Sequence, residues 1–218
     1  MPRRRAPETD ASVQGRLPPE ARRRQLLDEA SRILTELGIE QVQITEIAAR
    51  ADVSRPLVYR LFPTRQALVR ELLEDFAAFL QERFRDALAR ELPGTSEGIT
   101  QAFVEASCDA IEERGAGPWR LLVDARGADP EIGRLGREIF ARLLDPWQGQ
   151  LADLLQTTPR RAKICLWVIV AAGRAALDGW IDGGLSRREA VRDTTIAISA
   201  LLAAFTATPA SAKTRRVT

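Results

Sequence analysis

Basic and aromatic side chains gather in one short stretch of the sequence, between Ser54 and Phe62. Arg55 and Tyr59 lie about one helical turn apart, and Arg60 follows directly. A helix here would project the first two side chains from one face. Arginine makes the commonest specific contact with guanine in a major groove, and a short helix of this kind is typical of a recognition helix. These residue types therefore indicate DNA binding.

Positive charge is concentrated around this stretch rather than spread over the chain. The net charge of the 218-residue chain is only +2. Between residues 49 and 70, however, only Asp52 opposes a regular series of arginines, namely Arg50, Arg55, Arg60, Arg65 and Arg70. A local surface of this sign attracts the phosphate backbone. A nucleic-acid interface should therefore be confined to this part of the protein.

The sequence gives little support to catalysis. It has no histidine, which removes the commonest general base and the commonest metal ligand. Cys108 and Cys165 are far apart and have no partner motif, which is typical of a reduced intracellular protein. Gly133 and Gly136 fall inside a helical pattern and form no phosphate loop. We predict no catalytic residue, metal or cofactor, although a carboxylate site for a hard cation stays open.

Two short helices joined by a tight turn must position the basic side chains. Asp52 can adopt the left-handed backbone that such a turn needs. Ser54 is a good N-cap for the second helix, and Pro56 fits the first turn, where its missing N–H is harmless. Apolar residues at helical spacing should point to a core; these are Ile44, Ile47, Ala48, Ala51, Val58, Leu61 and Phe62.

This stretch resembles the DNA-binding domain of the tetracycline-repressor (TetR) family of bacterial regulators. The resemblance covers about residues 20–70. It rests on Ile47-Ala48-x-x-Ala51-x-Val53-Ser54, on Val58-Tyr59-x-x-Phe62, and on Pro63-Thr64-Arg65-x-Ala67-Leu68. The family usually has Ser or Thr at the position of Gln43, Gly at that of Asp52, and often Thr at that of Leu57.

The resemblance implies which residues contact DNA. The family tyrosine that matches Tyr59 usually binds a phosphate. Leu57 lacks the hydroxyl of the usual Thr and could instead touch a thymine methyl. Arg65, in the first turn of the next helix, is expected to hold a phosphate. The full set expected at the interface is Gln43, Thr45, Ser54, Arg55, Pro56, Leu57, Tyr59, Arg60, Thr64 and Arg65.

The periodicity of the remaining chain predicts an all-α protein in two parts. Residues 1–18 read as a disordered basic arm, in which Arg3-Arg4-Arg5 either contacts DNA or is merely solvated. The helix-turn-helix domain should span residues 19–66 and a helical ligand-binding and dimerisation domain residues 67–207, before a disordered tail at 208–218. Helices are expected at about 20–37, 64–92, 96–114, 118–125, 129–145, 147–155, 158–181 and 186–205, with Pro146 kinking or ending one of them.

The second part contains the residues for a possible ligand pocket. Its aromatic side chains fall on inward-facing positions of the predicted helices. Each of them alone is explained by core packing. As a set, they suit an apolar pocket between helices, and the family resemblance implies a small-molecule effector there. The expected pocket residues are Phe103, Trp119, Leu122, Trp147 and Trp167.

The last two predicted helices have more apolar and small surface than one subunit can cover. Small residues allow helices to approach closely, so we expect these helices to form a homodimer. The expected interface residues are Ala172, Ala176, Trp180, Ala197, Ala200 and Leu201.

These patterns favour a cytoplasmic, ligand-responsive transcriptional repressor. Its dimer would bind a near-palindromic operator in double-stranded DNA, and an apolar or amphipathic effector would favour a non-binding state. Two alternatives remain at this stage: a DNA-binding dimer whose body is structural or controlled by a protein partner, and a helical-bundle enzyme. No membrane is expected, because the most apolar run, residues 164–172, has about half the ~20 residues that a spanning helix needs.

Overall fold

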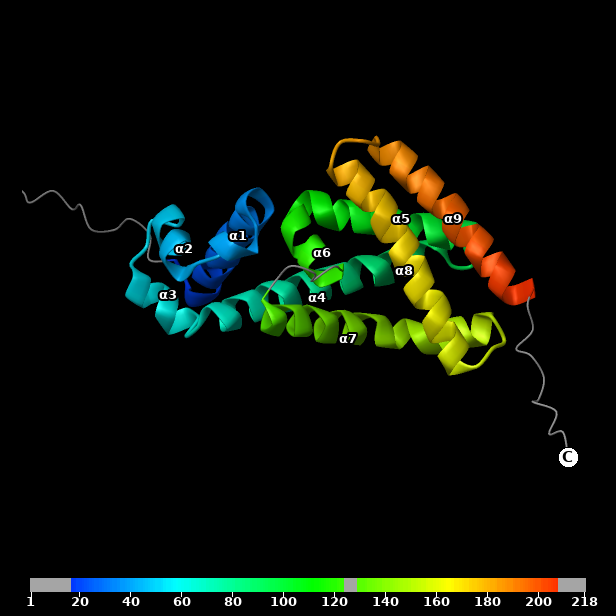
Figure 1. Ribbon diagram of the computed structural model, residues 1–218, viewed down its shortest axis with the longest axis horizontal. Helices are drawn as coiled ribbons and strands as arrows, with labels where there is room; N and C mark the ends of the chain where they lie inside the picture. Colours follow the sequence, from blue (N-terminus) through cyan, green and yellow to red (C-terminus); the bar gives the residue numbers. More distant parts are fainter. Residues whose placement is uncertain (1–16, 124–128, 208–218) are drawn as a thin grey trace, which may run out of the picture.

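The computed structural model describes residues 17–123 and 129–207, and within these ranges the protein is helical without strands. Most of the expected arm and tail lies outside the described residues. The elements are α1 (Pro19–Leu37), the 3₁₀ helix η1 (Ile39–Gln41), α2 (Ile44–Arg50), α3 (Arg55–Leu61), α4 (Arg65–Glu91), α5 (Ser96–Arg114), α6 (Ala116–Val123), α7 (Pro130–Leu154), α8 (Pro159–Ile181) and α9 (Arg187–Ala207). Figure 1 shows α1–α3 grouped at one end of an elongated molecule, which we call the head. The remaining helices form the body.

The head forms because α1 and the two short helices α2 and α3 bury their apolar faces together. Ile47 of α2, Val58 of α3 and Phe62 just after α3 are almost completely buried. Gly38 ends α1 with a φ of 83°, and Asp52 makes the α2–α3 turn with a φ of 51°, as expected for the left-handed position. Ser54 occupies the N-cap of α3, but its side chain makes no capping hydrogen bond.

Helix α4 joins the head to the body. It is 27 residues long, and the Thr64 hydroxyl caps it by accepting a hydrogen bond from the Ala67 amide. Its first turns bury Leu68 and Leu72 against the head, and later turns bury Phe76 and Leu80 in the body. In Figure 1 it runs from the head along α7, so one continuous helix crosses the boundary between the two parts.

The body confirms most predicted helix starts. Asp129 caps α7, Thr158 caps α8, and Ser186 and Glu189 form the expected capping box before α9. Helix α6 begins at Ala116, two residues earlier than predicted, which places Pro118 in its first turn.

The sequence predicts that Pro146 kinks or ends a helix, and the structure excludes the second outcome. Helix α7 continues as a single element from Pro130 to Leu154. Pro146 and Arg142, whose carbonyl would have accepted the missing N–H of Pro146, both lie on the exposed side of the helix. Water can therefore satisfy that carbonyl, which limits the cost of the lost hydrogen bond.

Helices α8 and α9 pack against each other and leave much of their apolar surface uncovered. Ile164, Trp167 and Val168 of α8 and Ile196 of α9 are exposed. Both helices are long and apolar enough to cross a membrane by length and composition alone. The most apolar part of α8 has a mean hydropathy of 1.6, and 11% of it is buried. The corresponding part of α9 has a mean hydropathy of 1.3, and 28% of it is buried. The apolar run at residues 164–172 is thus part of a longer apolar helix, so its shortness does not by itself exclude a membrane span. Core helices of soluble proteins meet the same criterion, so composition alone does not identify what covers this face.

Candidate nucleic-acid interface

Helix α3 has one buried and one exposed face. Val58 is completely buried, whereas Ser54, Arg55, Pro56 and Arg60 are exposed. Tyr59 is 50% exposed, a large fraction for an aromatic side chain with an apolar ring. Leu57 is half-buried at the edge of this surface. The residues that the sequence singled out on α3 therefore lie together on the outer face of the head.

The arginines of α3 differ from the other arginines of the head in how they are paired. Arg23 forms an ion pair with Glu71, Arg24 with Asp75, and Arg50 with Glu36 and Glu46. Arg55 and Arg60 have neither an ion pair nor a hydrogen bond with any residue that the structure describes. Their charge is not neutralised by any residue in the described ranges, so it is available for an anionic partner.

Helix α2 supplies the flank of this surface. Gln43 stands at its N-cap without a capping hydrogen bond, and its side-chain amide instead donates to the Glu40 carbonyl at 2.9 Å. The absence of the usual Ser or Thr thus leaves the first helix of the motif uncapped by a side chain. Thr45 is exposed in the first turn, where its hydroxyl can reach a ligand.

Arg65 has a structural contact that the sequence did not reveal. Its Nε donates to the Val42 carbonyl at 2.8 Å, and Nη2 donates to the Ile39 carbonyl at 2.6 Å. The guanidinium thereby fastens η1 and the start of α2 to the start of α4. Its Nη1 group forms no hydrogen bond within the described residues, so the phosphate contact expected for Arg65 stays a prediction.

Replacing Arg65 by Ala should destabilise the head. The substitution removes charge-assisted hydrogen bonds to two carbonyls, and we expect it to lower the free energy of unfolding by about 1–2 kcal/mol. Arg55→Ala is the matched control, because Arg55 makes no hydrogen bond or ion pair with the part of the chain that the structure describes. Thermal unfolding followed by circular dichroism compares the two variants. Equal melting temperatures for Arg65→Ala and the wild type would rule out the structural role.

The expected pocket residues lie in different surroundings, and their role in a pocket stays a prediction. Trp119 and Leu122 are buried in the core between α6 and its neighbours. Phe103 and Trp147 meet edge to face with centroids 5.1 Å apart. Trp167 lies on the exposed side of α8, with its ring 5.9 Å from that of Phe140.

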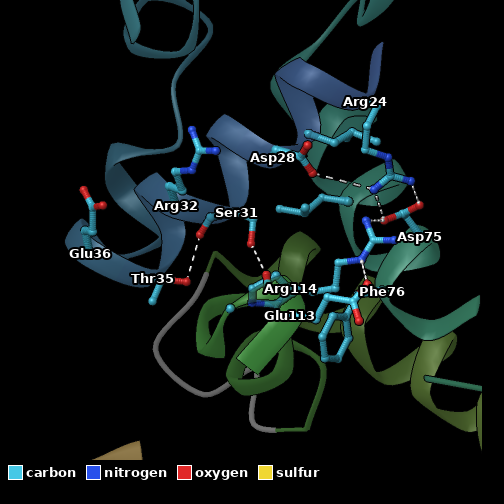
Figure 2. Close-up of a pocket in the computed structure, with 14 residues that line it drawn as sticks. Arg24, Asp28, Ser31, Arg32, Thr35, Glu36, Asp75, Phe76, Glu113 and Arg114 are labelled. Carbon is cyan, nitrogen blue, oxygen red and sulfur yellow. Dashed lines mark hydrogen bonds and ion pairs between the residues drawn. The ribbon is translucent and has the colours of Figure 1, made fainter. Parts of the chain in front are cut away.

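A cavity of about 420 Å³ lies elsewhere, between α1, α4 and the α5–α6 turn, and none of these five residues lines it (Figure 2). Within the described residues, no group of three or more His, Cys, Asp or Glu side chains is placed to hold a metal ion.

None of the expected interface residues is buried within the subunit. On α8, Ala172, Ala176 and Trp180 are half-buried, and on α9 Leu201 is half-buried while Ala197 and Ala200 are exposed. They lie on the two helices whose apolar surface is largely uncovered.

The chain is similar to known bacterial regulators. The sequence profile of bacterial regulatory proteins of the tetR family matches residues 26–72. The helix-turn-helix transcriptional regulator BetI of Cronobacter sakazakii is 28% identical over 173 residues, which are 76% of this chain and 80% of that protein.

Solved structures agree over most of the chain. A tetR-family transcriptional regulator from Streptomyces coelicolor is 26% identical, with a TM-score of 0.65, covering 88% of this chain and 84% of that one. LfrR from Mycobacterium smegmatis, solved in complex with proflavine, shares the fold with 24% identity and a TM-score of 0.51, covering 82% of this chain and 95% of that one.

Proposed function

The chain belongs to the tetR family of DNA-binding transcriptional regulators, and from this premise we propose that it is a homodimeric, ligand-released repressor acting in the cytoplasm. The observation that carries the DNA-binding part is the outer face of α3. It presents Arg55, Tyr59 and Arg60 together, and both arginines lack a partner within the described chain. In this proposal α3 enters the major groove, where Arg55 reads a base and the neighbouring side chains hold phosphates.

The dimer is supported by the uncovered apolar face of α8 and α9. A second copy can cover this face with an identical one, as a two-fold interface requires. Two heads related by such an axis would fit successive major grooves of a near-palindromic operator.

Ligand response is supported by the aromatic side chains of the body. The indole N–H groups of Trp119 and Trp147 are buried without a hydrogen-bond acceptor among the described residues. Buried polar groups usually have a partner, so a polar atom of an effector would satisfy them. The structural likeness to LfrR, which binds proflavine, supports an aromatic or amphipathic ligand. The effector releases the dimer from DNA only because it binds the state that does not bind DNA more tightly than the state that does.

The first experiment measures DNA binding by fluorescence anisotropy. Labelled duplexes from the DNA that flanks the gene are compared with shuffled duplexes of equal length. We expect saturable binding to at least one flanking fragment and weaker, salt-sensitive binding to the shuffled DNA. Equal affinity for both at physiological salt would contradict sequence-specific regulation.

The second experiment tests the effector. Aromatic and amphipathic compounds are screened by the intrinsic fluorescence of the four tryptophans, which include Trp119 and Trp147, and each compound that binds is added to the preformed DNA complex. Release of DNA by such a compound supports the proposal. A screen in which every binding compound leaves the DNA complex intact would favour the alternative, a structural or protein-regulated body.

A further inference from the structure

Apart from its contacts with α4, the head packs tightly against the body where α1 meets the end of α5 and the start of α6. The Ser31 hydroxyl donates to the Arg114 carbonyl, and the Gly117 amide donates to the Thr35 hydroxyl at 3.0 Å. A Cβ on Gly117 would lie 2.7 Å from the Thr35 backbone nitrogen. The two backbones therefore approach as closely as glycine allows, and this contact provides a fixed pivot.

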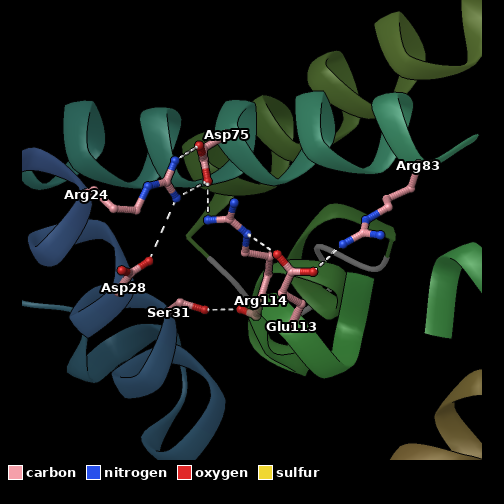
Figure 3. Close-up of polar contacts among 7 residues, drawn as sticks. All are labelled: Arg24, Asp28, Ser31, Asp75, Arg83, Glu113 and Arg114. Atoms are coloured by element: carbon pink, nitrogen blue, oxygen red, sulfur yellow. Dashed lines mark hydrogen bonds and ion pairs between the residues drawn. The ribbon is translucent and has the colours of Figure 1, made fainter. Parts of the chain in front are cut away.

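Beside the pivot, one carboxylate of α4 joins the head to the body (Figure 3). Asp75 accepts hydrogen bonds from both Nη groups of Arg24 on α1, one of them at 2.7 Å. The same carboxylate lies 3.7 Å from Nη1 of Arg114, the last residue of α5. Asp75 thus bridges two arginines that belong to different parts of the molecule.

The body side of this bridge is itself held in place. The guanidinium of Arg114 lies over the Phe79 ring, 4.5 Å from its centroid. The adjacent Glu113 forms an ion pair with Arg83 of α4. The end of α5 is therefore anchored on α4 at two further points, so Asp75 connects Arg24 to a rigid support.

The 420 Å³ cavity opens beside this bridge (Figure 2). Each charged side chain that borders it already has an ion-pair partner. A charged ligand would therefore compete with groups that are already paired. The cavity leaves unfilled space between α1, α4 and the α5–α6 turn.

We propose that Asp75 is a positioning residue for DNA binding, which fixes the angle between head and body by holding Arg24 and Arg114 together. Without the carboxylate, two like charges would face each other across a cavity that leaves room for movement. A small tilt at the pivot displaces α3, which lies at the far end of the head (Figure 1). The importance of this angle for operator binding rests on the proposed function, whereas the angle itself can be measured without DNA.

The test measures the head-to-body distance by pulsed electron spin resonance. Spin labels are attached at Ala49→Cys on α2 and Gln101→Cys on α5, both exposed positions. Labelled protein is diluted into unlabelled protein, so that only distances within one chain are observed. The native thiols are spared, because Cys108 and Cys165 are buried and burial raises the pKa of Cys108 to about 11.

We expect Asp75→Asn to broaden or shift the distance distribution, and Asp75→Glu to restore it. Glu71→Gln is the matched control, because it removes an α1–α4 ion pair of comparable exposure, 35% against 24%, that has no arginine of α5 beside it. Its distribution should match that of the wild type. Circular dichroism should show unchanged helix content in all variants.

An unchanged distribution for Asp75→Asn would overturn the proposal, as would equal broadening by Glu71→Gln. On a DNA fragment that the wild type binds, Asp75→Asn should lower affinity by about three- to tenfold. If the wild type binds no fragment specifically, the proposed function fails, while the distance measurement still decides the role of Asp75.

Discussion

Replacing Ile196 by Glu is expected to convert the protein from a dimer to a monomer and to abolish tight operator binding. Ile196 is 59% exposed on α9, so the substitution should leave the folded subunit intact. In a two-fold interface, however, it would bury an uncompensated carboxylate from each copy, which costs several kcal/mol. A monomer presents a single α3 and loses the gain from simultaneous binding of two half-sites. Sedimentation at micromolar concentration measures the change.

The matched control for this substitution is Leu37→Glu. Leu37 is 51% exposed at the end of α1, in the head and away from α8 and α9. It adds the same charge at a similarly exposed apolar position, so its sedimentation should match that of the wild-type dimer. A monomeric wild type, or an Ile196→Glu variant that sediments as a dimer, would refute the proposed interface.

Adding a single methyl group at Gly117 is expected to destabilise the protein by about 1–3 kcal/mol, because the packing at this point leaves no space. The new Cβ would lie 2.7 Å from the Thr35 nitrogen and 2.8 Å from the Leu34 side chain. To relieve this overlap, α6 must move away from α1 and weaken the hydrogen bond from the Gly117 amide. Chemical denaturation of Gly117→Ala measures the loss.

Gly149→Ala, by contrast, is expected not to lower the stability of the protein. Gly149 lies inside α7, and no atom lies within 4 Å of a Cβ added there. Alanine in a helix interior is favoured over glycine by about 0.5–1 kcal/mol, so this variant should be at least as stable as the wild type. If both variants had the same stability, the contact between α1 and the α5–α6 turn would not be tight.

The sequence was sufficient to predict the head because its signals are local. The spacing of Ile47, Val58 and Phe62 determines which faces of α2 and α3 are buried. Capping residues such as Thr158 and Asp129 determine where helices begin. The side chains of α3 that do not enter the core are then exposed, and these include Arg55, Tyr59 and Arg60. Periodicity and capping depend on neighbours a few residues away, which a sequence displays directly.

The contacts between head and body could not be predicted in this way. Arg24 and Asp75, or Ser31 and Arg114, are far apart in the sequence and meet only through the packing of whole helices. The hydrogen bonds from Arg65 to the carbonyls of Ile39 and Val42 likewise join residues that are far apart in the sequence. The placement of the aromatic residues was equally hidden, because an inward-facing helical position does not specify whether it borders the core, as Trp119 does, or the uncovered surface, as Trp167 does.

The role of α3 is tested most directly by the base preference of Arg55→Ala. Operator duplexes in which each base pair of a half-site is changed in turn are titrated with the wild type, Arg55→Ala and Arg32→Ala. Arg32→Ala is the control, because it removes an arginine of α1 that is paired with Glu29. At the base pair that Arg55 contacts, we expect the affinity of the wild type for the native base pair to exceed its affinity for the others by about 5- to 150-fold. Arg55→Ala should lose the preference at that one position and keep the others, while Arg32→Ala keeps them all. If Arg55→Ala instead lost affinity equally for every duplex, Arg55 would hold the phosphate backbone, and base recognition by this face of α3 would be contradicted.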